Sequence, residues 1–217
     1  MMVNNQNQRK EWVIHSQKAG FCLIVIVAGS SLYGLVLGYW RSPLQAFYAA
    51  IKLPILILTV LIGTAGISYI LSLVMKMKLN FKDFIMLKLS SYRFIILILI
   101  CMSPILLFVE YNLPSAQSQY ALKASILLNL IQVLFLAIAG VLSSTHIIEV
   151  SDLKSMYHKP RIILLIWLAI DLFLGAQISW ILRPFVSTAS KVELLRTDAW
   201  GGNFYESVLN MIMKIVS

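Results

Sequence analysis

The stretch Ile162–Phe185 reads IILLIWLAIDLFLGAQISWILRPF, a long apolar run that holds one acid, Asp171, and ends in Arg183, Pro184 and Phe185. A helix needs roughly 20 apolar residues to cross the hydrocarbon core of a membrane. Proline ends a helix, while arginine and aromatic side chains are anchors at the membrane surface. The stretch therefore predicts a membrane-spanning helix with an acid near its middle and an interfacial anchor at its end.

Similar apolar runs recur along the chain, in which 59% of the 217 residues are hydrophobic and 12% are charged. A soluble domain carries about 25% charged residues, so this composition excludes an ordinary water-soluble domain. We expect spans at about 19–39, 53–75, 91–110, 121–145 and 161–182. The prediction is an all-α polytopic membrane helix bundle of five transmembrane helices (19–182), preceded by an N-terminal tail (1–18) and followed by a C-terminal tail (183–217).

The net charge of +9 comes from 18 Lys and Arg residues that lie between the apolar runs and form no continuous basic face. This arrangement argues against nucleic acid as a partner. The bilayer itself is the expected partner. The two cysteines, Cys22 and Cys101, lie inside apolar runs, where a thiol behaves as a small hydrophobe, and they indicate neither a disulfide framework nor a metal site.

Basic residues are unevenly divided between the two sides of the predicted bundle. Eleven lie on the side of the N-terminus and three on the other: Arg9, Lys10, Lys18, Lys76, Lys78, Lys82, Lys88, Arg93, Lys154, Lys159 and Arg161, against Arg41, Lys52 and Lys123. Cytoplasmic loops carry the excess of Lys and Arg, so the N-terminus is predicted to be cytoplasmic. Five spans then place the C-terminal tail outside. That tail also holds basic residues, which a sixth short crossing or a re-entrant segment would reconcile.

Two short segments have the features of interfacial helices on the outer side. Residues 42–51 begin with Ser42, an N-cap residue, and Pro43 at the first helical position. Residues 203–216 open with Asn203 and have Glu206 three residues later, a pattern similar to a capping box. Trp180, Trp200 and Tyr205 fall on the same side, as in an aromatic belt. We expect these outer elements to fold against each other or against a partner.

Asp171, Gly175, Ser179 and Arg183 are spaced by four and share one face of the predicted fifth helix. One interpretation is a packing seam, because small residues let helices approach closely and a polar group can face the bundle. The other is a proton or ion relay centred on Asp171, because an ionisable group inside a membrane is costly. The packing interpretation is favoured, since a pathway needs more than one buried charge. We expect Asp171 either to be neutral or to form a hydrogen bond with Asn129 or Gln132 of the fourth span.

Small residues also recur at helical spacing in the first two predicted spans. These sets are Ser30, Gly34 and Gly38, and Thr64, Ser68 and Ser72. Such patterns favour a tightly packed bundle or an oligomer contact between helices.

No set of residues indicates catalysis. The histidines fall near the predicted cytoplasmic face, and no serine within a span has a histidine at its depth. His146, Glu149 and His158 are a weak candidate for a metal site, with solvated side chains as the simpler interpretation. We expect no catalytic residues, no metal and no cofactor.

Three stretches of the chain together resemble an uncharacterised family of small bacterial polytopic membrane proteins. In that family a helix ends in W-(I/V)-L-R-P-F, and a short tail carries a W-G-N-x-Y element. The matching stretches here are Lys52-Leu-Pro54, Ile178-Ser-Trp-Ile-Leu-Arg-Pro-Phe185 and Asp198-Ala-Trp-Gly-Gly-Asn-Phe-Tyr-Glu206, the last with one extra glycine. The resemblance implies a bacterial inner-membrane protein and brings no catalytic residues. In topology alone, five spans with a cytoplasmic N-terminus are similar to the Yip family of trafficking proteins.

The leading hypothesis is a non-enzymatic subunit or scaffold of a membrane complex, with other membrane subunits or further copies of the chain as partners. The contacts would come from Arg183 and the aromatic residues of the outer side. The alternative hypothesis is an ion- or proton-conducting channel or transporter centred on Asp171.

Overall fold

The computed structural model describes the backbone of residues 2–75, 80–150 and 160–182, together with Phe185, Tyr205, Glu206, Leu209 and Met213. Side chains are described from residue 19 on, apart from 146–150, 160, 161, 163 and 164. The elements in this part of the chain are five helices: α1 (Met2–Tyr39), α2 (Pro43–Val74), α3 (Phe81–Asn112), α4 (Ala121–Val150) and α6 (Pro160–Ile181). The predicted all-α class is confirmed.

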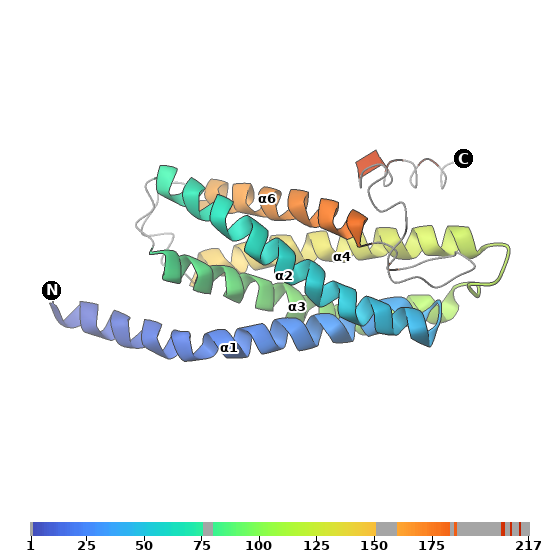
Figure 1. Ribbon diagram of the computed structural model, residues 1–217, viewed down its shortest axis with the longest axis horizontal. Helices are drawn as coiled ribbons and strands as arrows, with labels where there is room; N and C mark the ends of the chain where they lie inside the picture. The colour runs from blue at the N-terminus through green and yellow to red at the C-terminus, as the bar shows by residue number, and fades with distance from the viewer. Residues whose placement is uncertain are drawn as a thin grey trace.

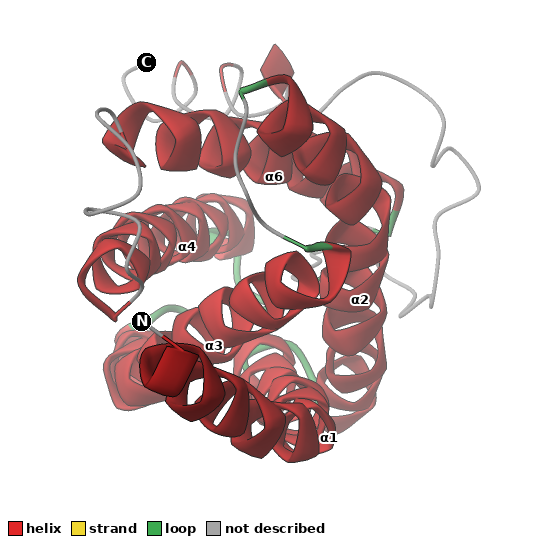
Figure 2. Cartoon of the chain, turned by 90° about the vertical axis from the view of Figure 1, so that its left-hand side faces the viewer, coloured by secondary structure: helices red, strands yellow, loops and turns green. Residues whose placement is uncertain are grey.

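The helices lie side by side and alternate in direction (Figure 1). α1, α3 and α6 run one way, and α2 and α4 run the other way. Seen along the bundle, α1 and α6 lie on opposite sides with α2, α3 and α4 between them (Figure 2). One end therefore gathers the start of α1, α3 and α6, and the opposite end gathers their last turns.

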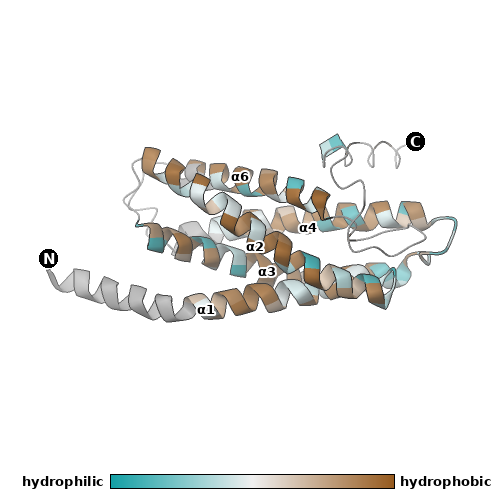
Figure 3. Ribbon diagram, viewed as in Figure 1, coloured by the Kyte–Doolittle hydropathy of each residue, from teal (hydrophilic) through white to brown (hydrophobic). Residues whose placement is uncertain are grey.

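Four helices are long and apolar enough to cross a membrane, namely Ala19–Tyr39, Pro43–Val74, Phe81–Asn112 and Ala121–Thr145. In α6 the described side chains form an apolar stretch over Leu165–Ile181, and the apolar sequence begins at Ile162. Large apolar side chains face outward along the bundle, with Ile62, Phe108 and Val74 at least 70% exposed. Hydrophobic residues make up most of the described length of the helices (Figure 3). Apolar side chains are unfavourable in water and favourable in hydrocarbon, so this exterior suits the interior of a membrane.

The helix predicted to start at Ser42 starts there. The Ser42 hydroxyl accepts a hydrogen bond from the Gln45 backbone N–H at 3.2 Å, and Pro43 occupies the first turn. The prediction that residues 42–51 form a separate interfacial helix was wrong, because α2 continues without a break through Pro54 to Val74. Its first turns are buried on one side, where Ala46 and Ala49 are at most 5% exposed, while Leu44 and Phe47 on the other side are 49% and 57% exposed.

The small residues of α1 explain why these first turns are buried. A Cβ added to Gly34 would lie 2.5 Å from the Ala49 carbonyl oxygen, and one added to Gly38 would lie 2.5 Å from the Ala46 Cα. The Ser30 hydroxyl, one turn earlier, is buried and donates to the Ile26 carbonyl at 2.6 Å. The backbones of α1 and α2 thus approach so closely that only hydrogen fits at the two glycines.

Candidate functional site: a buried ion pair and the outer end of the bundle

The most polar contact inside the bundle joins α3 to α6. The Lys88 ammonium donates to both carboxylate oxygens of Asp171, at 2.7 Å and 2.8 Å. The Lys88 side chain is 3% exposed and that of Asp171 is 20% exposed. A charge removed from water is stable only when it is paired, so each group makes the burial of the other tolerable.

Helical spacing places the neighbours of this pair. Phe84, Lys88 and Tyr92 are four apart and share one face of α3, and Trp167 lies four residues before Asp171 on α6. The Phe84 and Trp167 rings meet edge to face with centroids 5.1 Å apart, and the Lys88 Nζ lies 5.9 Å from the centroid of the Trp167 ring. The Trp167 ring therefore lies beside the Lys88 ammonium, with Phe84 packed against it.

Further hydrogen-bonding groups surround the carboxylate. The Tyr92 hydroxyl lies near Asp171 and Thr64, yet within the described part of the chain no atom meets it with hydrogen-bond geometry. The buried indole N–H of Trp167 also has no hydrogen-bond partner within the described part of the chain. The Thr64 hydroxyl donates to the Val60 carbonyl of its own helix at 2.9 Å. The aspartate is thus held by the lysine, and the Tyr92 hydroxyl near it has no hydrogen-bond partner among the residues that the structure describes.

The partner of Asp171 was not the one expected. Asn129 donates to the Ser125 carbonyl of its own helix at 2.8 Å, and Gln132 is half-buried on α4. Lys88 was counted as a loop residue because it precedes the apolar run 91–110. In the structure α3 begins ten residues before that run, at Phe81, with Asn80 as N-cap and Asp83 in the first turn. These two start signals and the spacing of Phe84, Lys88 and Tyr92 could have placed Lys88 on a helix.

Gly175, Ser179 and Arg183 were predicted to share one face of α6 with Asp171. Gly175 lies near α2, and Ser179 forms a hydrogen bond within α6. A Cβ added to Gly175 would lie 3.7 Å from a methyl carbon of Val60, an ordinary packing distance. The Ser179 hydroxyl donates to the Ala176 carbonyl at 2.8 Å. Arg183 and Pro184, the predicted interface anchor, lie outside the described residues.

At the opposite end of the bundle, Phe185 links the chain after α6 to the start of α2. The Gln45 side-chain amide donates to the Phe185 carbonyl at 2.8 Å, in a buried contact. The Lys52 Nζ lies 5.9 Å from the centroid of the Phe185 ring, a cation–π distance. Lys52 was assigned to a loop, but it lies inside α2 and is 2% exposed. The start of α2 and the beginning of the tail are therefore in contact.

Other predicted outer residues are placed only in part. Tyr205 is 47% exposed and stacks on Phe173 of α6, with ring centroids 6.2 Å apart, and Glu206 is exposed. Trp180 is half-buried, while Trp200 and Asn203 lie outside the described residues. The side chains of His146, Glu149 and His158 are also outside the described set. Among the side chains that are described, no group of three or more His, Cys, Asp or Glu could hold a metal ion.

A second buried acid, Glu110, escaped the sequence analysis because it closes the third apolar run. It is 6% exposed, and within the described ranges neither carboxylate oxygen has a hydrogen-bond partner. The Tyr33 hydroxyl of α1, which interacts electrostatically with Glu110, is likewise buried without a partner there. Nearby, the Trp40 indole donates to the Pro114 carbonyl at 3.1 Å and fastens the α1–α2 turn to the loop after α3.

The structure thus offers charged and hydrogen-bonding contacts at both ends of the bundle. No protein-family model, curated protein or solved structure matches the chain.

Proposed function

We propose that the chain is a five-span integral protein of a bacterial inner membrane, with its N-terminus in the cytoplasm, and that it acts as a non-enzymatic subunit or scaffold of a membrane complex. The Lys88–Asp171 ion pair carries this proposal. In this pair Asp171, the one acid of the α6 apolar run, links α6 to α3, because the Lys88 ammonium binds both of its carboxylate oxygens. Charges used in this way fix the arrangement of a bundle, and here they leave neither carboxylate oxygen of Asp171 without a partner.

The distribution of basic residues supports the proposed orientation. Lys52, Lys88 and Arg93 lie well inside α2 and α3, so we no longer count them as loop residues. Arg9, Lys10 and Lys18 precede the apolar stretch of α1, and Lys82 and Arg161 lie in the first turns of α3 and α6, at the same end of the bundle (Figure 1). Arg41 and Lys123 lie at the opposite end. The excess of positive charge is therefore assigned to the cytoplasmic side.

The outer end supports a role in assembly. Gln45 and Lys52 hold Phe185 against α2, and Phe173 stacks on Tyr205. These contacts place Phe185 and Tyr205 on the bundle. Side chains that are already held in place lose less conformational entropy when a partner binds than freely moving side chains do.

The test is the size of the complex in membranes solubilised with a mild detergent. We expect the tagged chain to run on a native gel well above a monomer in its micelle. Tyr205→Ala should reduce the large species, whereas Tyr111→Ala, the matched control on a 90% exposed aromatic residue at the end of α3, should leave it intact. A monomer without any co-purifying membrane subunit would overturn the proposal.

The second candidate function is proton or ion conduction through the region of Asp171. The buried Tyr92 hydroxyl and Trp167 N–H, which lack acceptors in the described part of the chain, favour it because they could bind water or an ion beside the carboxylate. Purified protein in liposomes, with a pH-sensitive dye inside, tests this candidate. Conduction predicts a flux that falls in Asp171→Asn, and a flux equal to that of the unsubstituted protein removes the candidate.

A further inference from the structure

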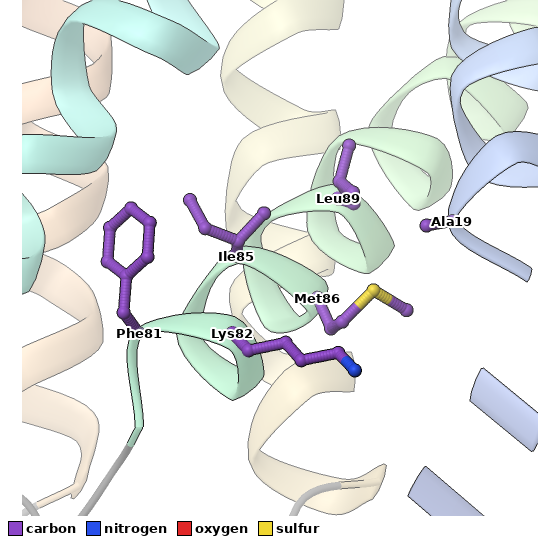
Figure 4. A pocket seen from close by; sticks show the side chains of 6 residues that line it. All are labelled: Ala19, Phe81, Lys82, Ile85, Met86 and Leu89. Carbon is purple, nitrogen blue, oxygen red and sulfur yellow. The ribbon is translucent and has the colours of Figure 1, made fainter. Parts of the chain in front are cut away.

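A hollow of about 340 Å³ lies between the first turns of α3 and the facing side of α1 (Figure 4). Its lining among the described side chains is apolar except for one cation: Ala19, Phe81, Lys82, Ile85, Met86 and Leu89. Lys82 and Met86 extend side by side toward α1, on which Ala19 lies across the opening (Figure 4). This hollow, called the slot below, is therefore apolar and has an ammonium group at its edge.

The depth of this slot follows from the two helices that form it. Ala19 is the first residue of the apolar stretch of α1, and Phe81 is the first residue of α3. Phe81 lies ten residues before the apolar run 91–110 of α3, so the first turns of α3 lie beside the start of the apolar stretch of α1. Leu89 lies eight residues further along α3, about 12 Å closer to the centre of the bundle at the helical rise. The slot therefore lies at the headgroup level and points toward the hydrocarbon layer, and water is a poor occupant of an apolar hollow.

We propose that this slot binds one anionic phospholipid, with an acyl chain along Ile85, Met86 and Leu89 and the headgroup phosphate against the Lys82 ammonium. The proposal rests on the membrane location proposed above and not on the role in a complex. Charge complementarity selects an anionic lipid, because Lys82 is the one charged group in the described lining and the chain carries a net charge of +9. The long side chain of an exposed lysine reaches the headgroup level by snorkelling.

The test is native mass spectrometry of the delipidated protein with added lipid. Phosphatidylglycerol and phosphatidylcholine with identical acyl chains compete in equal amounts. The first bound lipid should be phosphatidylglycerol by about fivefold, the gain expected from one lysine near an anionic headgroup. Lys82→Gln should abolish this preference and keep the binding of either lipid. Met86→Trp, which fills the slot, should weaken the binding of both lipids.

Lys123→Gln is the matched control, because Lys123 is also exposed and lies in the first turn of α4, at the opposite end of the bundle. The control should keep the fivefold preference. Lys82 is exposed, so its substitution leaves the fold intact and a null result is informative. Equal binding of the two lipids by the unsubstituted protein, or equal preference in Lys82→Gln and Lys123→Gln, would overturn the lipid site. A lipid preference that persists in a monomeric protein would leave the site standing and refute only the role in a complex.

Discussion

Replacing Asp171 by asparagine is the sharpest perturbation of the ion pair. Asparagine keeps the size of the side chain and one acceptor oxygen, and it removes the charge. Lys88, which is 3% exposed, would then keep its ammonium in the bundle without a counter-charge. Removing one partner of a buried pair costs about 3–5 kcal/mol of the free energy of unfolding. Asp171 is 20% exposed, so some water reaches the pair and we expect the lower end, about 3 kcal/mol.

The reciprocal change, Lys88→Met, should cost less. It leaves the charge on the more exposed partner, which water can hydrate, and we expect a loss of about 1–2 kcal/mol, typical of one unsatisfied polar group. The double variant holds no charge at this place. It should therefore be more stable than Asp171→Asn alone by about 2 kcal/mol.

The assay is reversible unfolding in mixed micelles of a mild detergent and sodium dodecyl sulfate, followed by far-ultraviolet circular dichroism. Lys82→Met is the control, since it makes the same chemical change at an exposed lysine of the same helix and should shift stability by no more than about 0.5 kcal/mol. The loss of stability in the double variant could instead equal the sum of the losses in the two single variants. That result would refute the idea that the two charges stabilise the bundle by neutralising each other.

Three further predictions use the same unfolding measurement. Gly38→Ala should lose about 1–3 kcal/mol of stability through overpacking, because its Cβ would meet the backbone of α2. Gly66→Ala, whose Cβ would have nothing within 4 Å, should be neutral or gain up to about 1 kcal/mol. Equal effects of the two substitutions would contradict the close approach of α1 and α2. Ser42→Ala should cost about 1 kcal/mol through the lost N-cap, while Ser42→Asp should not. Gln45→Met should cost about 1–3 kcal/mol by leaving the Phe185 carbonyl without its donor, and it should speed proteolysis of the tail; an unchanged cleavage rate would argue that this contact does not hold the tail.

Part of the candidate site could be predicted from the sequence, and part could not. The acid in the α6 run was recognisable, because a lone Asp171 among apolar residues has no ordinary explanation. Its partner was not, since the apolar run 91–110 hid the earlier start of α3 and moved Lys88 into a loop. Glu110 was missed because it is the last residue of the same run. Hydropathy marks where a helix is apolar, and it does not mark where the helix begins or ends.

The sequence by itself determined the all-α class, the positions of the apolar helices and the capped start of α2 at Ser42. These depend on local chemistry: the length of each apolar run, and the hydrogen bond between a serine and the N–H three residues later. Only the tertiary structure decided which buried groups meet. The pairing of Lys88 with Asp171 joins residues far apart in the chain, and the burial of Gln45 and Lys52 depends on α1 glycines that let α2 approach. Helical periodicity fixes the face on which a side chain lies, whereas the neighbour of that face is set by packing of the whole bundle.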